Sequence, residues 1–257
     1  MPPCPDRMEI TSKLCYDSLA RATPIPGLAL RLVRRPRHAE ENTAMGTERG
    51  PSASDIVYLF GDRFARRARL GGERLVHGGS KVKASDLAEQ LLIAAFVDLA
   101  SRGYVELERV EQKMLGMLTT RDVQVRRLAQ PGEPLHGLEA AIWDNIAGDP
   151  HEDQVRPIIR KIVGGKRPNP WSDIVDLARN GLAEQGYLIA DKEELRFRPD
   201  KIHWSANEES ILPHEGRVEE VKARLSSLET RDPALFKQLV DSVKRGIQAM
   251  VRQPDMM

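Results

Sequence analysis

The side chains best placed to bind a charged ligand are basic residues beside helix starts. Lys81 and Lys83 come directly before a segment in which apolar residues recur at helical spacing from Leu87 to Leu99. The N–H groups and the dipole at a helix N-terminus favour an anion, and lysine or arginine side chains there add charge-assisted hydrogen bonds. The pattern predicts an anion site at these lysines, with ordinary surface charge as the alternative.

Three further residue positions could contribute to such a site. Lys166 and Arg167 lie in a predicted loop before a helix that starts near Pro170, beside Trp171. Arg102 precedes a glycine at a predicted helix end. Each has a structural alternative: solvated charge for Lys166 and Arg167, core packing for Trp171, and a helix C-terminal cap for Arg102.

No arrangement of residues points to catalysis or to a metal site. The chain lacks a G-x-S-x-G, a Walker A loop and a G-x-G-x-x-G, and Cys4 and Cys15 both precede the predicted fold. None of the histidines has a partner at i, i+4, the spacing that would form a helical zinc pair; they are His38, His77, His136, His151, His203 and His214. We therefore expect a non-enzymatic protein with no metal and no cofactor. Acidic residues such as Asp98 are expected to be solvated.

Composition favours a helical protein of the cytoplasm. Of 257 residues, 40% are hydrophobic but only 5% aromatic, so the core should consist of aliphatic side chains. A net charge of +1 excludes a global basic field, so any attraction to an anionic surface must come from a local patch. No run approaches the roughly 20 apolar residues of a spanning helix. These features predict a mostly α fold.

A repeated sequence pattern organises the chain. Leu99–Leu107 and Leu182–Ala190 both begin L-A-x-x-G-Y. A glycine after the last apolar helical position favours a left-handed stop, and the following aromatic and aliphatic residues favour a strand. The chain is therefore expected to build a helix, a glycine stop and a hairpin twice. Residues 1–52, rich in proline, are expected to form a poorly ordered extension, and 53–257 one multi-helix domain with small β-hairpins.

Element boundaries follow from caps and alternation. Ser54 and Ser85 are predicted to cap the first two helices. Strands are predicted at 105–108, 114–118 and 123–128, and a hairpin with a charged tip, Asp191–Glu194, at 187–198. Two final helices carry apolar stripes. The last stripe, from Leu235 to Val251, could pack on its own domain or form a dimer or partner face, and the oligomeric state stays open.

The order of these elements matches one known family. The segments that carry the likeness are Leu91–Glu108, Thr120–Ile146, Lys166–Trp171 and Leu182–Phe197. With them, the chain from about Ser80 to Met250 resembles the Golgi phosphoprotein 3 family of phosphoinositide-binding proteins and its bacterial relatives. The resemblance implies a compact helical domain, without enzymatic activity, that associates with membranes by binding phosphatidylinositol 4-phosphate. It also implies possible protein-tail partners, since eukaryotic members hold cytoplasmic tails of glycosyltransferases.

The sequence departs from the family at its headgroup positions. Lys83 and Leu92 align with the family's tryptophan and first arginine, and apolar residues around Val175 and Leu177 replace its arginine pair. The resemblance thus predicts the fold and an anionic headgroup more strongly than it predicts phosphatidylinositol 4-phosphate. The headgroup residues expected here are Lys81, Lys83, Arg102, Lys166, Arg167 and Trp171.

A winged-helix DNA-binding regulator is the alternative. Helix, glycine stop and hairpin, used twice, also outline a winged helix, and the basic stretch from Arg63 to Arg69 could contact phosphates. Against it, the helix after Trp171 presents Asp173 and Asp176, which repel DNA, and the net charge is low for this role. A nucleic-acid partner is therefore less expected than an anionic membrane surface.

Overall fold

Helices make up most of the described chain, as the hydrophobic periodicity predicts. The computed structural model describes residues 50–114, 118–193 and 201–251, which belong to one unit, Glu48–Met257. The α-helices are α1 (Ala53–Leu59), α2 (Ala84–Ser101), α3 (Gly137–Asp144), α4 (Val155–Val163), α5 (Pro170–Glu184), α6 (Glu208–Ile211), α7 (Arg217–Arg231) and α8 (Pro233–Ala249). Two short 3₁₀ turns are η1 (Gly61–Arg63) and η2 (Leu212–His214).

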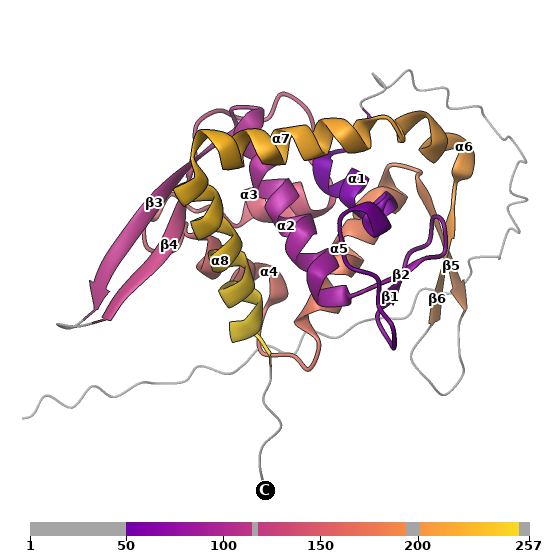
Figure 1. Cartoon of the computed structure of the whole chain (residues 1–257), viewed down its shortest axis with the longest axis horizontal. Coiled ribbons are helices and arrows are strands. Elements are labelled where there is room, and N and C mark those ends of the chain that lie inside the picture. Colours follow the sequence, from indigo (N-terminus) through magenta and orange to yellow (C-terminus); the bar gives the residue numbers. More distant parts are fainter. Residues whose placement is uncertain (1–49, 115–117, 194–200, 252–257) are drawn as a thin grey trace, which may run out of the picture. The chain divides into compact units, whose positions relative to one another are not determined.

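Strands occur in antiparallel pairs between these helices (Figure 1). The pairs are β1 (Glu73–Arg74) with β2 (Lys81–Val82), β3 (Val105–Met114) with β4 (Leu118–Arg127), and β5 (Leu188–Glu193) with β6 (Lys201–Ala206). The predicted extension, apart from residues 50–52, lies outside the described residues.

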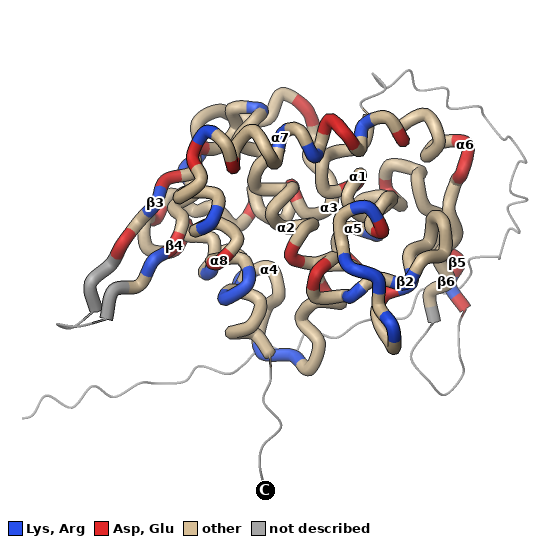
Figure 2. Tube along the Cα trace, viewed as in Figure 1, with Lys and Arg blue, Asp and Glu red and all other residues tan. Residues whose placement is uncertain are grey.

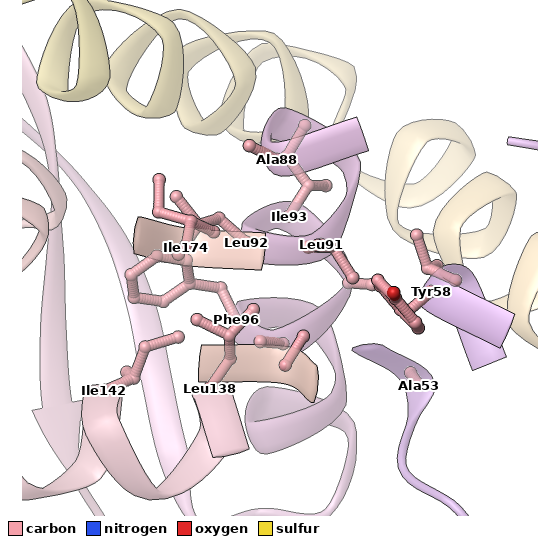
Figure 3. Packing of buried hydrophobic residues seen from close by; sticks show 14 of the residues in the cluster. Ala53, Tyr58, Ala88, Leu91, Leu92, Ile93, Phe96, Leu138, Ile142 and Ile174 are labelled. Atoms are coloured by element: carbon pink, nitrogen blue, oxygen red, sulfur yellow. The ribbon is translucent and has the colours of Figure 1, made fainter. Parts of the chain in front are cut away.

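Helix α2 forms the centre of the core because its second half is almost entirely apolar. Leu87, Ala88 and all residues from Leu91 to Leu99 are buried, and a helix that is apolar all round must be covered all round. Figure 3 shows Phe96 among side chains of α3 and α5, while Leu91 points toward Tyr58 of α1. The core is mostly aliphatic, as the low aromatic content predicts.

The first two helices each begin two residues earlier than predicted. Ser52, not Ser54, caps α1: its hydroxyl accepts from the backbone N–H of Asp55, whose carboxylate accepts from the N–H of Ser52. This reciprocal capping box outweighs a single serine cap, and it leaves Ser54 buried inside the helix. Lys83, not Ser85, is the N-cap of α2 and makes no capping bond with its side chain.

The repeated helix–glycine–hairpin unit is confirmed in both copies. Gly103, with φ 72°, follows the C-cap residue of α2, and Gly186, with φ 80°, follows that of α5. Each stop closes with the six-residue bond of a Schellman motif, and each tyrosine carbonyl then accepts a bond from the chain leaving the hairpin. The closing bonds are Tyr104 N to Leu99 O at 3.0 Å and Tyr187 N to Leu182 O at 2.9 Å, and the return bonds are Leu128 N to Tyr104 O at 2.8 Å and Asn207 N to Tyr187 O at 3.0 Å.

Both hairpins are longer than predicted. Of the strand predicted at 114–118, Met114 belongs to the end of β3 and Leu118 to the start of β4, and residues 115–117 lie outside the described residues. The charged residues 191–193 belong to β5 and pair with β6, rather than forming a tip, and residues 194–198 of the predicted hairpin are not among the described residues. Solvated strands carry charged residues on exposed faces, so their apolar alternation is weak.

The later helices agree with prediction. Gly164, with φ 74°, ends α4, Pro170 starts α5, and the carboxylate of Asp232 caps α8 by accepting from Leu235 N at 2.9 Å. Leu239, Val243 and Ile247 are buried in the core, so the apolar stripe of α8 packs on its own domain. Within the described ranges, no helix has both the length and the hydropathy needed to span a bilayer.

Candidate functional site

A short ribbon joins η1 to α2 and brings separate basic segments together. The N–H of Ala68 donates to Lys81 O at 3.0 Å, and the N–H of Lys83 donates to Arg66 O at 2.9 Å. On the other side of β2, Arg74 pairs with Lys81 in the β1–β2 ladder. The predicted lysine pair and the basic stretch from Arg63 to Arg69 are therefore parts of one surface.

This surface is strongly basic. Between Gly61 and Lys83 the chain has seven basic and two acidic residues, a net +5 in a chain of net +1, and Figure 2 shows these basic residues along the segment between α1 and α2. Five of them are exposed and have no carboxylate within ion-pair distance in the described part of the chain. We call these five the basic ribbon: Arg67, Arg69, Arg74, Lys81 and Lys83.

The ribbon places like charges opposite each other. Arg74 and Lys81 are direct cross-strand partners and both are exposed, whereas their neighbours Glu73 and Val82 are half-buried and buried. Side chains alternate along a strand, so both cations lie on the solvent side. Like charges in this relation repel, and an external anion would relieve that repulsion.

Helix α2 begins at this surface. Arg66 forms a fork with Asp86 in the first turn of α2, with Nε–Oδ2 at 2.5 Å and Nη2–Oδ1 at 3.0 Å. This hydrogen bonding lowers the pKa of the Asp86 carboxyl. The Asp86 carboxylate already interacts favourably with the dipole at the start of α2. Anion binding at this surface would therefore depend mainly on the five residues of the basic ribbon.

The predicted pair in the α4–α5 loop is only partly available. Arg167 forms an ion pair with Asp173 (3.2 Å), and its N–H donates to Met250 O at 2.9 Å. Trp171 is half-buried and packs on the core, which is its structural alternative. Lys166 is exposed. No hydrogen bond or ion pair among the described residues joins this loop to the basic ribbon.

Arg102 lies at the other end of α2 and is not part of this surface. It is the C-cap residue of that 18-residue helix, and its guanidinium is 2.6 Å from Asp98. Arg224 of α7 binds the same carboxylate at 2.9 Å. The expectation that Asp98 is solvated is wrong: its side chain is fully buried, because two arginines supply the partners that a buried carboxylate needs.

A second cluster of polar residues surrounds a small cavity beside Arg102. The cavity measures about 20 Å³, and Asp55, His136, Glu139 and Gln185 are among its lining residues. The space holds about one water molecule, too little for a substrate. Arg102 and Gln185 are the C-caps of α2 and α5, and Asp55 and Glu139 are the third residues of α1 and α3. Arg102 and Gln185 occupy the same place in the repeated L-A-x-x-G-Y pattern, so the ends of α2 and α5 meet at this cavity.

Glu139 is a buried carboxyl of this cluster whose pKa is raised. It is 2% exposed, and the Ser54 hydroxyl donates to its Oε2 at 2.8 Å. Burial, together with the nearby charges of Asp55 and Asp98, raises its pKa to about 8. Burial also raises the pKa of Asp55, which accepts a bond from Gln185 at 3.1 Å. At neutral pH the Glu139 carboxyl is therefore mainly protonated.

A wider hollow lies between the 130–135 loop and α3. It measures about 420 Å³ and is lined by Glu133, Trp143 and Asp144, among others. Its walls are mainly polar, unlike the mostly apolar walls of small-molecule sites. The described residues contain no group of three or more His, Cys, Asp or Glu side chains suited to a metal ion.

Comparisons with known proteins leave the family open. No protein-family model, curated protein or solved structure matches this chain. The resemblance to the Golgi phosphoprotein 3 family therefore stays a prediction.

The basic ribbon contains residues that sequence reasoning missed. Arg74 received no role, and Arg67 and Arg69 were considered only for DNA, although the density of basic residues between Gly61 and Lys83 was a usable signal. The strands that join them are two residues each and show no alternation. For Glu139 there was no such signal, since it reads as an ordinary acidic residue in a first helical turn.

Proposed function

We propose that this protein binds anionic phospholipid membranes peripherally through the basic ribbon, without catalysing a reaction. The observation that carries the proposal is the gathering of five exposed cations on one short ribbon, none of them with a counter-ion among the described residues, in a chain that is almost neutral overall. A surface of this kind is attracted to a layer of negative headgroups rather than to a single small anion.

The size of the attraction suits reversible binding. A lysine or arginine near an anionic leaflet contributes about 1 kcal/mol, so the five residues together would contribute about 5 kcal/mol. This corresponds to a dissociation constant of a few tenths of a millimolar. Binding should weaken steeply as salt screens the charges.

A DNA-binding role is less well supported by the helices. α2, the first candidate recognition helix, is buried along its length from Leu91 to Leu99. α5, the second, exposes Asp176 and Glu184, and its one arginine, Arg179, is engaged with Glu73 and Asp176. Duplex DNA is therefore an arm of the test rather than a second proposal.

The test is co-sedimentation of the full chain with vesicles. The vesicles contain neutral lipid alone, or neutral lipid with phosphatidylglycerol, phosphatidylserine or phosphatidylinositol 4-phosphate, each at low and physiological salt. We expect binding to all anionic vesicles and none to neutral ones. The variant Lys81→Glu/Lys83→Glu should lose about 2–4 kcal/mol of binding, a fall of at least about 30-fold.

A matched control separates a local site from net charge. Lys237→Glu/Arg245→Glu makes the same charge change at two exposed positions of α8 that have no ion pair in the described chain, on the other side of α2 from the ribbon (Figure 1). It should bind nearly as well as wild type. Equal losses in both variants, or duplex DNA binding in the absence of vesicle binding, would reject the proposal.

A further inference from the structure

The basic ribbon carries one apolar side chain that nothing in the described chain covers. Leu70 is 94% exposed, whereas the next most exposed large apolar residue, Leu212, is 58% exposed. A single exposed leucine is common on protein surfaces. Leu70 differs because it lies at the end of the ribbon, directly after Arg69 and between the cations on either side of it.

The backbone holds Leu70 away from the core. Gly71 and Gly72 follow it with φ 65° and 85°, a region that disfavours other residues. A Cβ at Gly72 would lie 2.5 Å from both the Ala68 side chain and the Val82 carbonyl oxygen. Only glycine fits this close approach. Gly72 therefore packs against β2, while the Leu70 side chain stays exposed to solvent.

An exposed apolar side chain beside several exposed cations matches the layers of a lipid leaflet. Lysine and arginine stems extend along the surface so that their charges stay at headgroup level, while an apolar side chain gains free energy by entering the acyl boundary below. DNA and an acidic peptide offer no such apolar layer beneath their charges, so a bilayer is the partner that fits both features.

We infer that Leu70 inserts into the acyl boundary of an anionic bilayer, with Arg67, Arg69, Arg74, Lys81 and Lys83 at the headgroups around it. This inference rests on the proposed function and adds a docking mode to it. The part of the protein that faces the membrane is then the basic ribbon, and the first turn of α2 directly follows it in the chain. The longer β5–β6 hairpin, with its charged residues Asp191 and Glu193, stays in water.

The test places a probe at residue 70. In the full chain carrying Cys4→Ser and Cys15→Ser, Leu70→Cys is labelled with an environment-sensitive dye, and Leu212→Cys, next to acidic residues, is the matched control. With vesicles of neutral lipid and phosphatidylglycerol, the fluorescence emission of the dye at residue 70 should shift to shorter wavelength. Lipids spin-labelled near the headgroup should quench this emission. The probe at 212 should show neither change.

Unlabelled variants measure the contribution to binding. Leu70→Ala should lower the vesicle partition coefficient about tenfold and leave its salt dependence unchanged, since no charge is removed. Leu212→Ala should bind like wild type. Wild-type binding with an unquenched probe at 70 and no loss in Leu70→Ala would overturn the insertion alone. Absence of wild-type binding to anionic vesicles would overturn the proposed function and the insertion with it.

Discussion

Glu139→Gln should remove a loss of stability that occurs as the pH rises from about 5 to 8. Glu139 is buried, and in the described chain no cation pairs with its carboxylate; instead Ser54 donates two bonds, from its hydroxyl and from its N–H. Its pKa is about 8 in the folded protein, against an ordinary value of 4.5. The folded state thus holds this proton more tightly than the unfolded state does.

The sign and size follow from proton linkage. A group whose pKa is raised on folding stabilises fully below its unfolded pKa and loses that contribution as pH rises through the folded pKa. Between 4.5 and 8 the loss is about 1.4 kcal/mol per pH unit, or up to about 5 kcal/mol in total. Between pH 6 and pH 8, wild type should lose about 2–3 kcal/mol through this group.

Urea denaturation at pH 5 to 9 measures this directly. Glu139→Gln keeps the shape but cannot ionise: its amide oxygen can accept from the Ser54 N–H, and its NH2 group can donate to the Ser54 hydroxyl oxygen. It should therefore match wild type near pH 5 and exceed it by a few kcal/mol at pH 8. Glu229→Gln, at an exposed position of α7, should follow the wild-type curve. A wild-type free energy of unfolding that does not fall between pH 6 and 8, or the same fall in Glu139→Gln, would refute the reasoning.

Three further substitutions test the packing and capping of the helices. Gly181→Ala would place a Cβ 2.5 Å from Gly137 Cα at the α3–α5 crossing and should cost about 1–3 kcal/mol in thermal unfolding; an unchanged melting temperature would show that the helices are not this close. Asp98→Ala would leave its arginine partners, including Arg224, without a buried counter-ion and should cost about 3–5 kcal/mol, whereas a loss below about 1 kcal/mol in urea would mean that Asp98 is solvated. Ser52→Ala removes the capping box of α1 and should lower the free energy of unfolding by about 1 kcal/mol. Ser226→Ala, at an exposed serine of α7, is the control, and an equal loss in that variant would contradict the capping role.

Sequence alone predicted the features that short segments determine. The glycine stops at Gly103 and Gly186 depend on residues within one helical turn, and both were confirmed. The buried stripes of α2, α5 and α8 follow from spacing within each helix. The repeated L-A-x-x-G-Y pattern therefore predicted two of the helix–hairpin units of the fold.

The rest depends on contacts between distant residues. One of the two arginine partners of the buried Asp98 is Arg224, 126 positions later, and Glu139 contacts Ser54 across 85 positions. The candidate site was found in part: Lys81 and Lys83 lie on the basic ribbon, but Arg102 lies at the far end of α2 and Arg167 is paired with Asp173. Pairing between two-residue strands, which joins Arg74 to Lys81, left no periodic signal.

The central claim is that the basic ribbon attracts the protein to anionic lipid. The most direct measurement is the salt dependence of the partition coefficient on phosphatidylglycerol vesicles, for wild type and for Lys81→Glu/Lys83→Glu. Our account predicts strong wild-type binding at low salt that falls steeply toward physiological salt, and a weak, nearly flat curve for the variant. Two curves that coincide across this range would contradict it.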